Sequence, residues 1–186
     1  VEVGEDVEIE ANVIFEGNVK LGDQVQIKSN TIIKNSVICS GTEVKPYTII
    51  EDSLVGKKCN IGPFARIRPN STLEESVGIG NFVEVKASNI KKNTKANHLT
   101  YLGDSDIGEN VNVGAGVITC NYDGVNKHKT VIKDNVFIGS DSQLIAPIIV
   151  EEGVTIAAGS TITDNSEKDS LLIARSRQQE KKNWKR

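Results

Sequence analysis

The chain has no methionine, only two histidines and only three cysteines among its 186 residues. It also begins inside a repeat, whereas repeat proteins usually have a capping segment, so we expect a fragment that lacks an N-terminal part. Cys39, Cys59 and Cys120 lie far apart and form no metal-knuckle spacing. An odd set of scattered cysteines favours a reduced, cytoplasmic setting. Cys59 falls on a small inward position and is predicted to belong to the core.

Long apolar runs and an excess of positive charge are missing as well. No stretch is long and apolar enough to span a membrane, and no signal peptide is present. The formal net charge of −3 argues against bulk binding of nucleic acid. The length suits one domain.

What the sequence does contain is a six-residue rhythm of aliphatic side chains. It runs through Val3, Ile9, Phe15, Leu21, Ile27 and Ile33, is clear again from Val55 to Val85, and returns from Ile132 to Ile162. A period of six fits neither a helix face nor a simple alternating strand, and it is the signature of a parallel β-helix. Three hexads would close a triangular coil of eighteen residues, with glycine at the corners because tight turns often need positive φ. The predicted fold is therefore all-β, a left-handed parallel β-helix, by the resemblance of this hexad to left-handed β-helices.

The rhythm also has breaks. Five-residue steps such as Ile33 to Ile38 predict some coils of seventeen residues. The spacing of thirteen between Thr119 and Ile132 predicts an inserted loop at about residues 120–130. We expect the β-helix to cover residues 1–166 and a C-terminal tail to cover residues 167–186. The tail carries the cations Arg175, Arg177, Lys181, Lys182, Lys185 and Arg186. A frayed, solvated cap is favoured over a role in binding an anion.

Stacking the coils predicts a group of charges on one corner. Arg66, Glu84 and Tyr101 share one column, and Arg68 and Lys86 share the next, beside the loop that carries Lys127. One interpretation is an exposed ladder in which Glu84 neutralises Arg66, worth little energetically. The alternative, which we favour, is a phosphate site, since cations outnumber the carboxylate.

Small residues stack in a second column. His98, Ala115, Ser140 and Ala158 take the same position in successive coils. Three small side chains would leave a slot roughly 14 Å long that ends at His98. Such a slot suits a thin acyl carrier, and histidine is the usual general base. The alternatives are that small residues merely suit a corner and that a lone histidine is structural. His128, in the polar loop, is expected to be solvated.

Several long segments resemble the GlmU family. They include 62–69 (GPFARIRP), 80–86 (GNFVEVK), 98–104 (HLTYLGD), 112–116 (NVGAG) and 119–124 (TCNYDG). GlmU enzymes combine an N-acetylglucosamine-1-phosphate uridyltransferase with a glucosamine-1-phosphate N-acetyltransferase, and the resemblance covers only the acetyltransferase half. Asn97 departs from the glycine expected before the histidine in some relatives.

The resemblance implies acetyl transfer from acetyl-CoA to the amine of glucosamine-1-phosphate. This is a step in UDP-N-acetylglucosamine synthesis for peptidoglycan and lipopolysaccharide, and so for the cell wall and cell shape. It implies a homotrimer with sites between subunits, and no metal in this half, since Mg²⁺ and UTP would belong to the absent N-terminal half. The implied catalytic residues are His98 and, less directly, Glu84. The implied sugar-phosphate residues are Arg68, Lys86, Tyr101, Asn112 and Lys127. The implied acetyl-CoA residues are Ala115, Asn121, Tyr122, Ser140, Ala158 and Arg175.

Three other functions are open. Another hexapeptide acyltransferase could act on a different amine or hydroxyl. A zinc lyase similar to γ-type carbonic anhydrase needs three histidine ligands, and this chain has only His98 and His128. A structural or regulatory β-helix without catalysis is the third.

Overall fold

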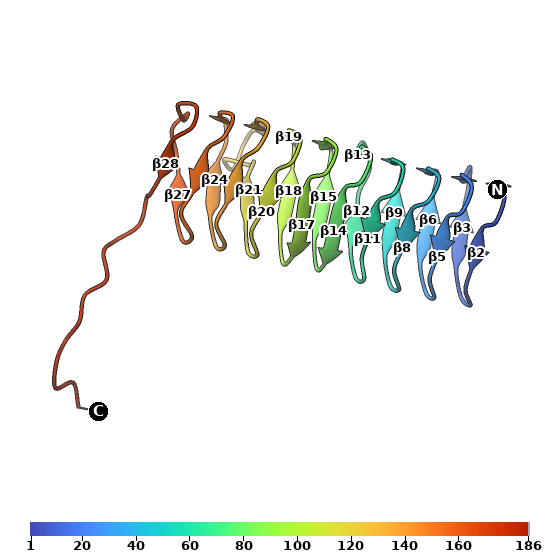
Figure 1. Ribbon diagram of the computed structural model, residues 1–186, viewed down its shortest axis with the longest axis horizontal. Coiled ribbons are helices and arrows are strands. Elements are labelled where there is room, and N and C mark those ends of the chain that lie inside the picture. The colour runs from blue at the N-terminus through green and yellow to red at the C-terminus, as the bar shows by residue number, and fades with distance from the viewer. Residues whose placement is uncertain (186) are drawn as a thin grey trace.

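The computed structural model describes residues 1–185, and Arg186, the last of the predicted tail cations, lies outside the described residues. The described chain is a three-sided parallel β-solenoid of about ten coils with no helix (Figure 1). The predicted all-β hexapeptide β-helix is confirmed, and its hand is left.

Each side of the solenoid is one parallel sheet, and successive strands of the chain visit the three sheets in turn. The first sheet contains β1 (Glu2–Val3), β4 (Lys20–Leu21), β7 (Val37–Ile38), β10 (Leu54–Val55), β13 (Thr72–Leu73), β16 (Asn89–Ile90), β19 (Ser105–Ile107), β22 (Thr130–Ile132) and β25 (Ile148–Val150). The second sheet contains β2 (Glu8–Ile9), β5 (Gln26–Ile27), β8 (Glu43–Val44), β11 (Asn60–Ile61), β14 (Gly78–Asn81), β17 (Lys95–His98), β20 (Asn112–Val113), β23 (Phe137–Ile138), β26 (Thr155–Ile156) and β28 (Leu171–Leu172). The third sheet contains β3 (Ile14–Glu16), β6 (Ile32–Lys34), β9 (Ile49–Glu51), β12 (Arg66–Ile67), β15 (Glu84–Lys86), β18 (Tyr101–Gly103), β21 (Ile118–Cys120), β24 (Gln143–Ile145) and β27 (Thr161–Ile162).

The register follows the sequence period. Leu54 pairs with Thr72, eighteen residues later, but with Val37, seventeen residues earlier. The five-residue steps therefore shorten single coils without shifting the stack. Because each residue in a parallel ladder lies beside its counterpart in the next coil, sequence columns become spatial columns.

The core is a stack of aliphatic side chains inside the prism. Ile33, Ile50, Ile67 and Val85 are fully buried in successive coils of the third sheet. Cys59 is buried among them, and burial raises the pKa of its thiol to about 11. The prediction that Cys59 belongs to the core is confirmed. Apolar burial of this kind stabilises the fold by roughly 25 cal/mol per Å².

The reason for the glycines differs from the prediction. Of the glycines that follow an inward aliphatic residue, Gly62 has positive φ, whereas Gly80 and Gly114 do not. A Cβ at Gly80 would overlap the carbonyl oxygen of Asn97, and one at Gly114 would lie 2.6 Å from the amide nitrogen of Ser140. Close stacking of the next coil, rather than turn geometry, excludes a side chain at these two positions. Most corners with positive φ carry other residues, often asparagine or aspartate.

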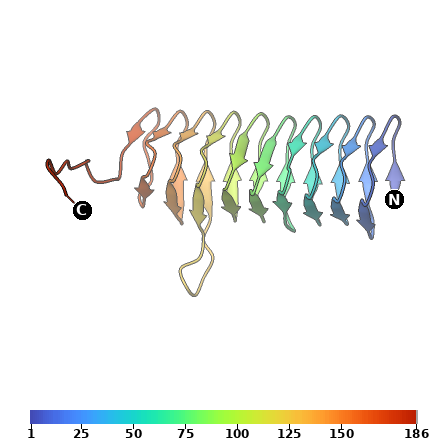
Figure 2. The same cartoon turned by 90° about the horizontal axis from the view of Figure 1, so that it is seen from below.

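The inserted loop leaves the solenoid between β21 and β22, as the sequence predicted, and protrudes from the prism (Figure 2). In the region predicted to be the tail, β28 adds one more strand to the second sheet after residue 166. Ala174 still bonds to Ser160 and Thr161 of the last coil, and residues 175–185 are exposed and extend away from the stack (Figure 1). The division into a β-helix and a tail at residue 166 stays a prediction. Among residues 1–185, no helix is long and apolar enough to cross a membrane.

Candidate functional site

The charged residues predicted to share a corner lie on the outward face of the third sheet. Arg66 stacks on Glu84 and Glu84 on Tyr101, as predicted. The pairing of charges differs: Arg68 Nη1 lies 2.8 Å from Glu84 Oε1, and Arg66 Nη2 lies 3.5 Å from Glu51 Oε2. The less favoured interpretation, in which Glu84 neutralises Arg66, is wrong, because the guanidinium of Arg68 in the neighbouring column reaches that carboxylate instead.

Lys86 has a partner that the sequence interpretation missed. Its Nζ lies 3.2 Å from Asp104 Oδ2, and both side chains are largely buried, at 18% and 23% exposure. The side-chain amide of Asn121 donates to the same carboxylate and to the hydroxyl of Tyr101, the latter at 3.5 Å. Lys127 reaches back from the loop, and the positive charge of the nearby Lys86 ammonium lowers the pKa of Lys127.

We call these seven side chains the charged cluster: Arg66, Arg68, Lys86, Lys127, Glu51, Glu84 and Asp104. Four cations face three carboxylates, so the excess of positive charge is one rather than the larger value expected from Glu84 alone. Asp104 could have been found from the sequence, because it follows the residue that stacks on Lys86, Gly103.

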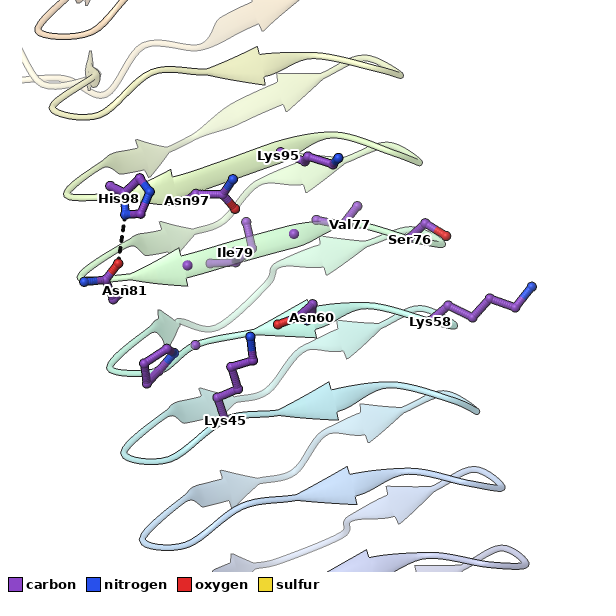
Figure 3. Close-up of a pocket in the computed structure, with 14 residues that line it drawn as sticks. Lys45, Lys58, Asn60, Ser76, Val77, Ile79, Asn81, Lys95, Asn97 and His98 are labelled. Carbon is purple, nitrogen blue, oxygen red and sulfur yellow. Dashed lines mark hydrogen bonds between the residues drawn. The ribbon is translucent and has the colours of Figure 1, made fainter.

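His98 lies at the end of β17, at the corner between the second and third sheets. Its Nδ1 is 2.9 Å from Oδ1 of Asn81, which occupies the same position one coil earlier (Figure 3). Since Asn81 Oδ1 can only accept, Nδ1 carries the proton, and the Nε2 of a neutral ring is left with its lone pair. The ring is exposed to solvent.

The column of small residues above His98 is present. Ala96 pairs with Val113, Val113 with Ile138, and Ile138 with Ile156. Two residues beyond these positions come His98, Ala115, Ser140 and Ala158, in that order along the stack. The next member, two residues after Leu172, is Ala174, which is followed by Arg175.

The remaining predicted site residues divide between different places. Asn112 lies on the second sheet beside Lys95, away from the charged cluster. Asn121 is buried against that cluster rather than along the small-residue column. Tyr122 lies on the loop and is 60% exposed. In one chain, therefore, His98 and the charged cluster lie on different sides of a corner.

The inserted loop is held by its own contacts. Tyr122 and Lys127 form an antiparallel bridge, and Asp123 Oδ2 lies 2.6 Å from Nε2 of His128. Backbone N–H groups of Asn126 and Val125, with His128, lower the pKa of Asp123 to about 2. His128, predicted to be simply solvated, thus has a partner. This loop presents Lys127 to the charged cluster.

A groove of about 520 Å³ lies on the second sheet and ends at His98 (Figure 3). Its lining includes Lys45, Lys58, Lys95 and Asn97, and none of its fourteen lining residues is acidic. The sequence interpretation missed this groove. The signal in the sequence was a set of outward-facing glycines, Gly62, Gly78 and Gly80, close to lysines. Among residues 1–185, no three His, Cys, Asp or Glu side chains are grouped as ligands for a metal.

The fold and the repeat define the class of this protein: it has the hexapeptide transferase fold. Residues 129–164 match a family model described as bacterial transferase hexapeptide (six repeats). Residues 1–77 match the model of the C-terminal domain of GMPPB (GDP-mannose pyrophosphorylase B).

Two solved structures show the same fold. A UDP-N-acetylglucosamine acyltransferase from Campylobacter jejuni is 16% identical, with a TM-score of 0.68 over 90% of this chain and 71% of that chain. LpxA, a UDP-N-acetylglucosamine acyltransferase from Bacteroides fragilis, is 15% identical, with a TM-score of 0.50 over 89% of this chain and 68% of that one. At such identities the likeness concerns the fold alone.

These matches correct the identification made from sequence motifs. Membership of the GlmU family is wrong, because the first 77 residues match the GMPPB C-terminal domain. The predicted acetylation of glucosamine-1-phosphate on the pathway to UDP-N-acetylglucosamine is wrong for the same reason. What stands is the hexapeptide β-helix itself.

Proposed function

We propose that this chain is an acyltransferase that moves an acyl group from a coenzyme A thioester, such as acetyl-CoA, to an amine or hydroxyl. The acceptor carries an anionic group, and His98 is the general base. The fold supports this proposal, because the same solenoid occurs in the two acyltransferases named above.

The hydrogen bond between His98 and Asn81 carries the proposal. It leaves the lone pair on Nε2, in an exposed ring at the end of the small-residue column. A neutral imidazole held in one tautomer is ready to accept a proton. Asn81 is a positioning residue in this scheme, since its side chain acts through the hydrogen bond to His98.

The reaction is an acyl transfer with balanced protons. Nε2 of His98 removes the proton of the acceptor amine or hydroxyl as its nitrogen or oxygen attacks the thioester carbonyl. The tetrahedral intermediate collapses, the carbon–sulfur bond breaks, and the imidazolium returns the proton to the leaving thiolate. The base is then neutral again.

The charged cluster would hold the anionic group of the acceptor. Arg68, Lys86 and Lys127 supply the positive charge, and Tyr101 supplies a hydroxyl next to them. Glu84 would orient the acceptor amine once the anion has drawn Arg68 away from it. Arginine and lysine suit phosphate or carboxylate through charge-assisted hydrogen bonds. Asn112, on the second sheet, would add a side-chain amide to the acceptor site.

The small-residue column would hold the donor. Ala115, Ser140 and Ala158 offer a strip roughly 14 Å long at the spacing of parallel strands. Arg175, directly after Ala174, would meet the phosphates of coenzyme A at the far end of the strip. The exposed loop residue Tyr122 would close one side of the donor site, whereas Asn121 is held against the charged cluster.

We further propose a homotrimer with each site shared between two chains. In a single chain His98 and the charged cluster face different sides of a corner, so a neighbour is needed to complete the site. The same corner carries an exposed stack of Tyr47, Phe64 and Phe82, with ring centroids 5.0 and 5.4 Å apart. Each of these aromatic residues has positive φ, which costs energy for a bulky side chain. An exposed apolar row at such a cost is typical of an interface.

A thioester-cleavage assay tests the base. With acetyl-CoA and a panel of phosphorylated and unphosphorylated sugars, we expect His98→Ala to lower kcat at least about 100-fold. Asn81→Ala should lower it about tenfold, and Asn81→Asp, which keeps an acceptor for Nδ1–H, should restore most of it. Asn89→Ala is the matched control, because Asn89 is an exposed asparagine on the first sheet that bonds the next coil. If His98→Ala stays within tenfold of the parent, the base assignment is wrong.

A mixing experiment tests the shared site. His98→Ala and Lys86→Ala chains, each inactive alone, are unfolded together and refolded as mixed trimers. If one chain supplies His98 and its neighbour supplies Lys86, about a quarter of the interfaces regain both residues. No recovery in verified mixed trimers would contradict the shared site.

One observation favours a second function. Residues 1–77 match the C-terminal domain of GMPPB, and most charges of the charged cluster are already paired. The chain would then be a non-catalytic β-helix that serves as an assembly or regulatory module of a larger protein. Absence of thioester cleavage with every acceptor, in a folded trimer, would select this function.

A further inference from the structure

The groove on the second sheet exists because three outward positions lack side chains. Gly62, Gly78 and Gly80 form its floor, in the strands and corners of two successive coils. Two of them are needed by the backbone: Gly62 has φ +95°, and a Cβ on Gly80 would overlap Asn97. Gly78 is different, because its φ is ordinary and the nearest atoms to an added Cβ would be at ordinary contact distance: Lys95 Cγ at 3.5 Å, Asn97 Oδ1 at 3.6 Å and Lys95 Cβ at 4.0 Å. The fold would accept a side chain at Gly78, so its absence keeps the groove open.

The walls of the groove carry positive charge without compensation. Neither Lys45 nor Lys95 has a carboxylate within 4.0 Å among residues 1–185, and only Lys58 is paired, with Glu75 at 3.2 Å. Lys45 rises from the coil below toward Asn60, whereas Lys58 points away (Figure 3). The amide groups of Asn60 and Asn97 add neutral hydrogen-bond donors. Lysine ammoniums with amide donors are suited to a phosphoryl group.

We propose that this groove, which we call the lysine groove, binds the phosphate of a phosphate ester, with Lys45 and Lys95 as its charge partners and Gly78 as its floor. A volume of about 520 Å³ accommodates a phosphorylated sugar or a nucleotide. The groove ends at His98, so the organic part of a bound ester extends toward that ring. This assignment of the ligand to the groove does not depend on acyl transfer, although it places a phosphate ester beside the proposed base.

Titration calorimetry at low ionic strength tests the proposal with three probes: inorganic pyrophosphate, glucose-1-phosphate and UDP. Amide shifts in a TROSY spectrum locate each probe. We expect binding that shifts Lys95 and Asn97, and a loss of at least tenfold in affinity for the double variant Lys45→Met/Lys95→Met. Gly78→Val should block binding to a similar degree by filling the floor, with a melting temperature no lower than that of the parent. The tightest of the three probes identifies the source of the phosphate, a simple sugar phosphate or a nucleotide.

Matched controls separate this groove from other sites. Lys58→Met removes a lining lysine that is already paired and points outward, so it should change affinity less than twofold. Arg68→Met removes a cation of the charged cluster, so it should weaken only binding there and leave the probe-induced shifts of Lys95 and Asn97 unchanged. Inorganic pyrophosphate has no organic part to reach the ring, so His98→Ala should leave its affinity within twofold of the parent, which separates a failure of the base from a failure of the groove. Affinity within twofold of the parent in both Lys45→Met/Lys95→Met and Gly78→Val, or shifts confined to the charged cluster, would overturn the proposal.

Discussion

Two faces of this solenoid carry positive charge in opposite ways. On the third sheet, Arg68 and Lys86 each contact a carboxylate, at 2.8 and 3.2 Å. On the second sheet, Lys45 and Lys95 line a groove that contains no acidic residue. The charges on the third sheet are satisfied by the protein, so a ligand there must displace existing partners. Lys45 and Lys95 have no carboxylate within 4.0 Å among residues 1–185, so an anion there gains contacts without breaking an ion pair.

The largest expected difference in stability is between two glycines in the floor of the lysine groove, Gly80 and Gly78. Gly80→Ala forces a Cβ into the backbone of the next coil, so we expect a loss of more than about 2 kcal/mol in unfolding free energy. Gly78→Ala meets ordinary contacts only, and should be neutral or stabilise by up to about 1 kcal/mol through the unfolded state. Urea unfolding of both variants measures the difference. Equal losses would mean that Gly78 is also a packing residue, and the groove would be a by-product of the fold.

The second contrast concerns lysines on the two faces. Lys86→Met leaves the largely buried Asp104 without its cation, so we expect unfolding free energy to fall by about 1–2 kcal/mol. Lys95→Met removes no ion pair and should change it by less than about 0.5 kcal/mol. Chemical denaturation of the two variants in parallel compares them. If Lys95→Met destabilised as much as Lys86→Met, the distinction between a satisfied and an unsatisfied face would fail.

The smallest expected effect is a pH-dependent change in the order of the loop that borders the charged cluster. Hydrogen bonds from the amides of Asn126 and Val125, with His128, hold the pKa of Asp123 at about 2, below its usual 3.8. Because the folded pKa is depressed, this contribution to loop order is complete above about pH 4 and is lost as the pH falls through 2. Asp123→Asn should abolish the transition. The amide resonances of Val125 and Asn126 between pH 5 and 1.5 report it, and an unchanged profile in the variant would contradict the role of Asp123.

The sequence period was sufficient to predict the coils, the seventeen-residue steps, the loop and the columns of Arg66 and His98. In a parallel stack, spacing along the chain fixes which residues lie side by side, and no long-range information is needed. The partners within a column were less predictable. Glu84 could reach the guanidinium of either neighbouring column, and the side-chain geometry that favours Arg68 is not encoded in spacing.

The lysine groove and the family could not be predicted for different reasons. A glycine in a repeat has the same letter whether it makes a turn, permits close stacking or leaves a hollow, so Gly62, Gly80 and Gly78 could not be separated before the backbone was known. The family was inferred from motifs between residues 62 and 124, whereas the match that corrects it covers residues 1–77. A motif in a repeat protein gives information about the coils that contain it. It does not determine which family the neighbouring coils resemble.

Because the coils of seventeen and eighteen residues stack evenly, distance along the solenoid axis increases by the same amount with every coil. Every outward position recurs at a fixed step of about 4.8 Å along the axis, whichever residue occupies it. Inserting or deleting one whole coil between His98 and Ala158 would change the distance between these two residues by one such step. The environment of each residue would stay intact. The length of a molecule that such a protein accepts can therefore change in discrete increments, without redesign of the residues that hold its two ends.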